Sequence, residues 1–195
     1  GTRISENPYY RSYKLGARRG CAPLNGHTLT AAGAKKDNQP MSNPTIILPP
    51  CANERVPEAA HAWHHMVDVQ SRFNDFDIFG HVNNSCYMQY LDLAKVRYFE
   101  AALGHKVDTD GIAAVIVNIN VNFYSPAYFG EQLAVLTACV RISRRSFSLE
   151  QRVVNPETGD VKCVATTVLA SFDVKTATSP ELSDEWADAL TRFEK

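Results

Sequence analysis

One segment restricts the possible folds more than any other: residues 85–103, which contain neither Pro nor Gly and have the composition of a helix. Its polar side chains form only a narrow stripe, made of Gln89, Asp92, Lys95 and Glu100. Apolar side chains cover the rest of the circumference, and this pattern predicts a helix that is buried on most sides. Asn84 or Ser85 can cap its start, and Gly104 is expected to end it.

The segments around this helix are expected to be strands. One precedes it and four follow it, at residues 63–73, 112–124, 131–142, 145–154 and 161–174. The later strands are linked mostly by short turns, such as the Pro- and Gly-containing turn 155–160, and short turns join antiparallel neighbours. A buried helix and an antiparallel sheet must bury their apolar faces against each other. The sequence therefore predicts an α+β fold, in which an antiparallel sheet wraps around one long central helix.

The two ends of the chain differ from this pattern. Residues 1–60 lack sustained periodicity and carry eight Lys or Arg against four Asp or Glu, so we expect an extended or weakly ordered arm before a domain of residues 61–195. The arm also has the composition of a transit peptide, and Met41 offers another alternative, in which a tag or misassigned start precedes it. Residues 180–194 predict an amphipathic C-terminal helix that starts at Pro180.

Composition argues against several classes of protein. The five cysteines are odd in number and none has C-x-x-C spacing, which indicates reduced thiols in a cytoplasmic protein. The net charge of −1 gives no sign of a nucleic-acid partner, and the basic arm lacks the paired amphipathic helices of a DNA-binding head. No apolar run reaches the ~18 residues of a membrane span.

The segment richest in candidate catalytic side chains lies directly before and within the helix: 72-RFNDFDIFGHVNNSCYMQYLDLAK-95. It resembles the signature of the 4-hydroxybenzoyl-CoA thioesterase family, which has the hot-dog fold. The resemblance extends over roughly residues 67–174 and includes 144-RRSF-147, which is similar to the family's basic turn. It implies an acyl-CoA thioesterase that hydrolyses a thioester to a carboxylic acid and CoA. Coenzyme A is then part of the substrate, and no separate cofactor is implied.

The resemblance also implies roles for two residues. Asp77 matches the family's catalytic carboxylate, either as a nucleophile that forms a mixed anhydride or as a general base for water. The simpler alternative is a turn residue that bonds its own backbone. The backbone N–H of Asn84 matches the oxyanion donor, at a helix start that carries about half a positive charge.

Other residues of the motif are more ambiguous. His81 either takes part in the site or orders the loop. The stretch H-V-N-N also resembles plant acyl-ACP thioesterases, but Phe79 stands where those enzymes have Asn. Asn83 and Tyr87 are candidates for substrate binding, with turn formation and core packing as their respective alternatives. Asp75 is expected to order the loop or face solvent.

Two charged motifs remain. Arg144 and Arg145 suit the phosphates of CoA, although a solvated hairpin turn would have the same composition. The D-x-D run mimics the start of a calcium loop, but Phe79 and Cys86 stand where oxygen ligands are needed, so we expect no metal.

An isolated sheet of this kind exposes long edges, and proteins with the family's fold pair through their sheets, so we expect a homodimer or a dimer of dimers. Asp92 and Lys95 stand where the family usually has Glu and Arg. Two rival functions stay open: an acyl-ACP thioesterase, and a sensor that binds acyl-CoA without hydrolysing it. Retention of Asp77 argues against the sensor.

Overall fold

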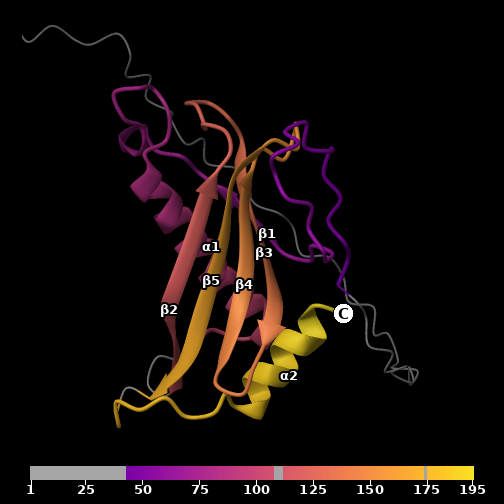
Figure 1. Ribbon diagram of the computed structural model, residues 1–195, viewed down its shortest axis with the longest axis vertical. Helices are drawn as coiled ribbons and strands as arrows, with labels where there is room; N and C mark the ends of the chain where they lie inside the picture. The colour runs from indigo at the N-terminus through magenta and orange to yellow at the C-terminus, as the bar shows by residue number, and fades with distance from the viewer. Residues whose placement is uncertain (1–42, 108–111, 174) are drawn as a thin grey trace, which may run out of the picture. The chain divides into compact units, whose positions relative to one another are not determined.

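The computed structural model describes residues 43–107, 112–173 and 175–195. Its elements, in chain order, are β1 (Met66–Val69), η1 (Phe73–Asp75), α1 (Asn84–Leu103), β2 (Ile112–Phe123), β3 (Leu133–Ile142), β4 (Ser146–Val154), β5 (Val161–Asp173) and α2 (Asp184–Phe193). The five strands form one sheet of order β1-β3-β4-β5-β2, and all neighbours are antiparallel. Figure 1 shows α1 lying across the back of this sheet. The predicted α+β architecture of the hot-dog fold is therefore confirmed.

The start of α1 lies one residue earlier than predicted. Asn83 is the last extended residue and its side chain accepts a hydrogen bond from the backbone N–H of Ser85, at 2.9 Å, so Asn83 is the cap instead of Asn84 or Ser85. The predicted end at Gly104 is confirmed. This glycine has a φ of 78° and donates its N–H to the carbonyl of Glu100, at 3.0 Å.

Only one side of α1 is covered within a single chain. Tyr87, Leu91 and Ala94 are buried against the sheet, whereas Leu93 is 47% exposed and Val96 is 44% exposed. The prediction of a helix buried on most sides is thus wrong for the single chain, because one five-stranded sheet can cover only the face that it contacts. The apolar residues on the outer face of α1 remain available for another contact.

The C-terminal helix closes the far end of the core. It begins at Asp184 with Ser183 as its cap, which corrects the predicted start at Pro180. Leu190 is buried in a cluster with Tyr98, Phe99, Phe147 and others. The carboxylate of Glu194 also attaches the end of this helix to α1 and β3. It accepts hydrogen bonds from the Tyr98 hydroxyl and from the backbone N–H of Cys139.

Part of the face of the sheet opposite α1 is covered by residues 43–63, which we call the strap. The strap has no helix or strand, and its ends meet where the N–H of Ile46 donates to the carbonyl of Trp63, at 2.7 Å. It packs on an apolar cluster that includes Leu136, Val154 and Val161. The strap contains residues 43–60 of the predicted arm, while residues 1–42 lie outside the described residues. The first strand is also shorter than predicted, because the chain pairs with β3 only over Met66–Val69.

Candidate active site

The loop between β1 and α1 folds into a small hairpin. Phe76 pairs with Val82, Asp77 donates its N–H to the carbonyl of His81 at 3.0 Å, and Gly80 donates to the carbonyl of Asp77 at 3.0 Å. Gly80 has a φ of 77°, a conformation that other residues rarely adopt. The sequence D-I-F-G-H therefore forms a tight turn that places Asp77 and His81 on the two adjacent sides of the hairpin.

Asp75 anchors this loop from behind. Its side chain is buried and accepts hydrogen bonds from the Tyr90 hydroxyl at 2.7 Å, from the Arg72 backbone N–H at 2.8 Å and from the Arg72 guanidinium. Burial alone would raise the pKa of Asp75, but these bonds and the Arg72 charge together hold that pKa below its ordinary value. Of the two predicted alternatives, loop ordering describes Asp75 and solvent exposure does not.

Asp77 and His81 form a partly exposed pair. One carboxylate oxygen of Asp77 accepts the backbone N–H of Phe79 at 2.8 Å, as a turn residue would. The other oxygen lies 3.6 Å from Nδ1 of His81, and the Phe79 ring stacks on the imidazole. The turn bond therefore occupies only one oxygen, and the second remains available for chemistry or for orienting His81.

The start of α1 leaves one backbone donor free. Within the first turn, the side chain of Asn83 binds the N–H of Ser85 and its carbonyl binds the N–H of Cys86. The N–H of Asn84 has no hydrogen-bond partner among the described residues. A free donor at a helix N-terminus is the arrangement that stabilises a developing oxyanion.

A cavity of about 270 Å³ opens beside this donor. It is lined by His81, Val82, Asn84, Tyr87, Phe123, Tyr124, Ser125 and Pro126. Tyr87 is buried and packs edge-on against Phe123, with ring centroids 5.2 Å apart. Burial, assisted by nearby acidic groups, raises the pKa of Tyr87 to about 12, so its hydroxyl stays protonated at neutral pH. Tyr87 is thus a core residue, which was the alternative to substrate binding. It also forms part of the cavity wall.

Besides Val82, four lining residues from outside the motif were not predicted from the sequence: Phe123, Tyr124, Ser125 and Pro126. They reach the cavity because the turn between β2 and β3 folds onto the loop before α1. Ala127 accepts the N–H of Val82 at 2.8 Å, and Tyr128 pairs with His81. No chemical motif marks these residues, and only the end of a strand at Phe123 signals that a turn begins there.

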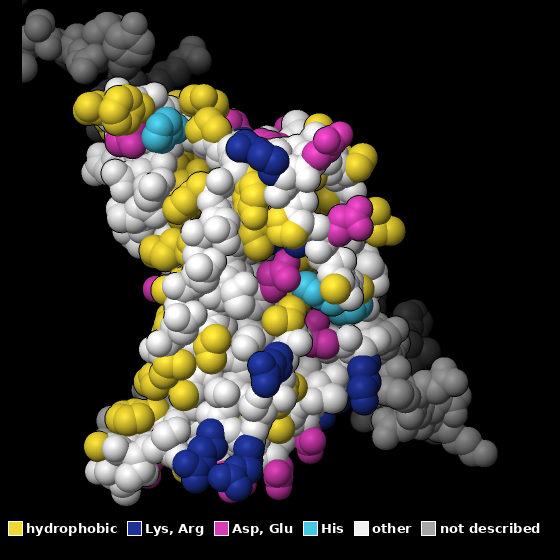
Figure 2. Space-filling view, in the orientation of Figure 1, with side chains coloured by type: hydrophobic (Ala, Val, Ile, Leu, Met, Phe, Trp, Pro, Cys, Tyr) yellow, Lys and Arg dark blue, Asp and Glu magenta, His cyan; other side chains and the backbone are white. Residues whose placement is uncertain are grey.

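Arg144 and Arg145 do not join this group within one chain. They lie in the turn between β3 and β4, at the opposite end of the sheet from the loop before α1, where Figure 2 shows basic side chains gathered at the lower end. The nine residues of β4 separate the two ends by about 30 Å. Arg144 is exposed and lies 3.5 Å from Glu181.

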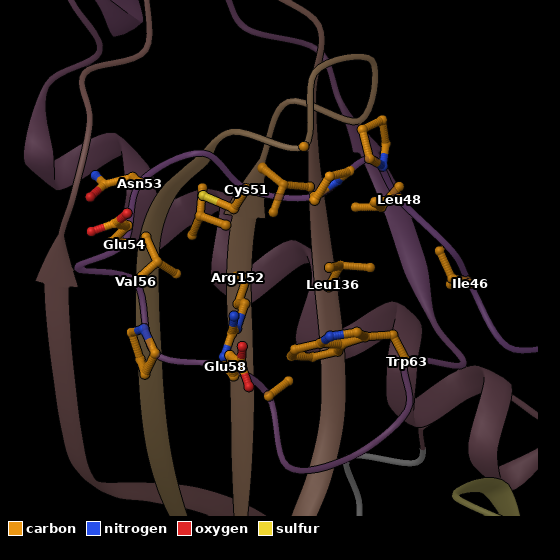
Figure 3. Close-up of a pocket in the computed structure, with 17 residues that line it drawn as sticks. Ile46, Leu48, Cys51, Asn53, Glu54, Val56, Glu58, Trp63, Leu136 and Arg152 are labelled. Carbon is orange, nitrogen blue, oxygen red and sulfur yellow. The ribbon is translucent and has the colours of Figure 1, made fainter.

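A larger cavity, of about 680 Å³, lies on the other face of the sheet. Figure 3 shows the strap passing around it, with Trp63, Leu136 and Arg152 among the lining residues. Arg152 is paired with Glu150 at 2.7 Å and its guanidinium lies over the Trp63 ring. None of Asp77, His81 and Asn84 lines this cavity. The smaller cavity is therefore the candidate active site.

The described residues contain neither a cluster of metal ligands nor a membrane-spanning helix. No three His, Cys, Asp or Glu side chains of the described residues converge as a metal would require. Within the same part of the chain, every helix is too short or too polar to cross a membrane.

Comparisons with known proteins identify the family to which the chain is similar. A family model described as the thioesterase-like superfamily matches residues 71–190. The long-chain acyl-CoA thioesterase FadM of Escherichia coli (strain K12) is 27% identical over 128 residues, which cover 65% of this chain and 97% of FadM.

Among the solved structures that are similar in fold are two thioesterases. The YbaW probable thioesterase from Escherichia coli has a TM-score of 0.59 and 26% identity, covering 68% of this chain and 100% of that one. A thioesterase from Thermus thermophilus, complexed with coenzyme A and Zn, has a TM-score of 0.57 and 25% identity, covering 68% of this chain and 95% of that one. The strap precedes the residues that match the family model.

Proposed function

This chain belongs to the thioesterase-like superfamily and is an acyl-CoA thioesterase, and we propose that Asp77 is its catalytic carboxylate. The observation that carries the proposal is the free N–H of Asn84 at the start of α1, a few residues after the Asp77–His81 pair. The cavity that both His81 and Asn84 line gives a thioester carbonyl a place beside this donor.

The proposed reaction uses these groups in order. The carbonyl oxygen of the thioester accepts the N–H of Asn84, which is worth about 2.7–4 kcal/mol in the transition state. Asp77 takes a proton from water, the resulting hydroxide attacks the carbonyl carbon, and the C–S bond breaks to release CoA thiolate and the acid. In the alternative, Asp77 attacks the carbonyl carbon directly, the C–S bond breaks to release CoA thiolate, and water then hydrolyses the resulting mixed anhydride to the acid and the free Asp77 carboxylate.

The structure supports a second candidate for the base. His81 lines the cavity whereas Asp77 does not, and Nδ1 of His81 lies 3.6 Å from the Asp77 carboxylate. In this arrangement Nε2 of His81 would accept the proton of water, and Asp77 would orient the imidazole. Both routes need Asp77, so the distinction lies in the effect of His81→Gln, which removes the base but retains a polar side chain.

The test is thiol release from short, long and aromatic acyl-CoAs by wild type, Asp77→Asn and Asp92→Asn. The matched control changes an exposed carboxylate on α1 that pairs with Lys95 away from the cavity. We expect Asp77→Asn to lower kcat by about 100-fold or more, and Asp92→Asn to retain it. Equal activity of Asp77→Asn and wild type would contradict the proposed role.

We also propose that the chain pairs with a second copy through β2. β2 is an edge strand of 12 residues, and its side chains Ile116, Val117, Ile119 and Phe123 are exposed. In Figure 2 hydrophobic side chains follow the left edge of the molecule, where β2 runs in Figure 1. Antiparallel pairing of two β2 strands about a two-fold axis would remove this open edge.

The same two-fold axis supports a role for the basic turn. Antiparallel pairing reverses the partner's strands, so Arg144 and Arg145 of the partner subunit would lie at the end that carries this chain's Asp77 and Asn84. There they would suit the phosphates of CoA. Sedimentation of Val117→Lys tests the pairing: a protein that stays dimeric with a charge in the middle of β2 would contradict it. The exposed face of α1 would serve a dimer of dimers.

We further propose a long-chain acyl-CoA substrate and a cytoplasmic location. The relative FadM is a long-chain acyl-CoA thioesterase, so long acyl chains are the first substrates to assay. The four described cysteines are free thiols, which supports a reducing compartment such as the cytoplasm. Activity only on acyl-ACP would favour the carrier-protein alternative, and binding without hydrolysis would favour the sensor.

A further inference from the structure

A buried lysine beside the candidate active site has no part in the proposed chemistry. The side chain of Lys162, in β5, is 4% exposed. Its ammonium group lies 2.6 Å from the carboxylate of Glu131, 2.8 Å from that of Asp160 and 3.0 Å from the carbonyl of Pro126. An ammonium group has three donors, so all three are used.

These contacts keep the lysine charged. Burial on its own would lower the pKa of Lys162, but hydrogen bonds and charge interactions with Asp160 and Glu131 raise it above its ordinary value. A buried ion cluster is a costly way to gain stability alone, which suggests that this one has a positional role.

The cluster is linked to the cavity wall by a short chain of bonds. The second carboxylate oxygen of Glu131 accepts the backbone N–H of Tyr128, at 2.9 Å. Tyr128 pairs through its backbone with His81. Pro126, which accepts from Lys162, lines the cavity directly and precedes Ala127, which binds the N–H of Val82.

A second arm of the cluster holds the start of the same turn. The hydroxyl of Ser125 donates to Asp160 at 2.8 Å, and the N–H of Tyr124 donates to the carbonyl of Lys162 at 2.8 Å. Tyr124 and Ser125 also line the cavity. Residues 124–128 are thus attached on one side to the Lys162 cluster and on the other to the backbone of His81 and Val82.

We propose that Lys162, Glu131 and Asp160 are positioning residues that hold the β2–β3 turn against His81 and Val82. They would thereby fix the width of the cavity and the placing of His81 relative to the N–H of Asn84. This inference rests on the proposed function for its effect on catalysis. Displacement of reacting groups by about 1 Å costs on the order of 100-fold in rate, so a small shift of this turn has a measurable effect.

The main variant is Lys162→Met, which keeps the length of the side chain and removes all three donors. The matched control is Arg152→Met, which breaks another buried ion pair, between Arg152 and Glu150, at the outer cavity under the strap. The Arg152 side chain is 8% exposed and lines the outer cavity, whose lining includes no residue of the loop before α1. Both variants are expected to lose stability.

Activity distinguishes the two variants. With a long acyl-CoA we expect Lys162→Met to lower kcat by about 10- to 100-fold with a smaller change in KM, and Arg152→Met to keep kcat within about two-fold. Lys162→Arg should recover part of the loss, because it restores the charge and the donors. Glu131→Gln, which retains an acceptor for Tyr128, should be more active than Glu131→Ala.

Amide hydrogen exchange gives a readout that does not depend on activity. Peptides covering residues 81–84 and 124–131 should exchange faster in Lys162→Met than in Arg152→Met, relative to wild type. Unchanged exchange in both peptides, or equal losses of kcat in the two variants, would overturn the inference. If Lys162→Met does not fold, Lys162→Arg and Glu131→Gln provide the same comparison. Loss of activity in Asp77→Asn with normal kcat in Lys162→Met would leave the proposed function intact and reject the positioning role.

Discussion

The two faces of the sheet each carry a cavity, and the smaller of the two is the candidate active site. The outer cavity, under the strap, measures about 680 Å³, against about 270 Å³ for the cavity at the start of α1. In the outer cavity the buried charge of Arg152 is already matched by Glu150. At the inner cavity the backbone donor of Asn84 is unmatched among the described residues. A donor without a partner identifies a reactive site better than volume does.

The difference extends to how each cavity is built. The outer one is enclosed by residues 43–63, a segment without helix or strand. The inner one is built on the end of a 20-residue helix and on a turn tied to β5 through Lys162. Catalysis requires groups held within fractions of an ångström, and rigid elements provide that more readily than a single extended segment.

The largest expected effect comes from removing the unmatched donor itself. Asn84 is the first residue of α1, where Pro is well tolerated because the N–H has no partner within the helix. Asn84→Pro deletes this N–H and should lower kcat by about 100- to 1000-fold while changing the melting temperature little. Asn84→Ala is the control, since it removes the side chain and retains the N–H. Equal kcat for the Pro and Ala variants would show that the donor is not used.

A smaller effect is expected from the anchor behind the inner cavity. Asp75→Asn should lower the free energy of unfolding at pH 7 by about 1–3 kcal/mol, because charge-assisted hydrogen bonds with Arg72 and Tyr90 are weakened. The folded-state pKa of Asp75 lies below its ordinary value, so its contribution is present above that ordinary value and is lost as pH falls through the folded pKa. Urea titrations from pH 7 to pH 2 should therefore show the gap between wild type and variant closing in acid. A gap that stays constant to pH 2 would contradict this account.

The sequence predicted the framework because the framework depends on local patterns. Alternating apolar residues identified the strands, and the absence of Pro and Gly identified α1 to within one residue of its start. The motif placed Asp77, His81 and Asn84 in one short segment, and adjacent residues in a tight turn are bound to lie near one another. The roles of these three residues remain predictions.

The features that were not predicted all depend on contacts between distant residues. Asp75 is buried because Tyr90, fifteen positions later, reaches back to it. Lys162 meets Glu131 and Pro126 only after β2, β3 and β5 have assembled. Neither pairing has a period or spacing that could be recognised in advance. The separation of Arg144 and Arg145 from Asp77 likewise follows from the length and direction of β4 and not from any local signal.

The smallest effect is expected at the outer cavity. The guanidinium carbon of Arg152 lies 5.5 Å from the centroid of the Trp63 ring. Trp63→Leu removes this ring and keeps an apolar side chain in the strap. We expect a loss of about 1 kcal/mol in stability, from the cation–π contact and part of the ring packing, and a kcat within about two-fold of wild type. Chemical denaturation and thiol release measure the two quantities on the same preparation. A large fall in kcat without a matching fall in stability would mean that the outer cavity is coupled to the site across the sheet, and the division between a structural face and a catalytic face would then fail.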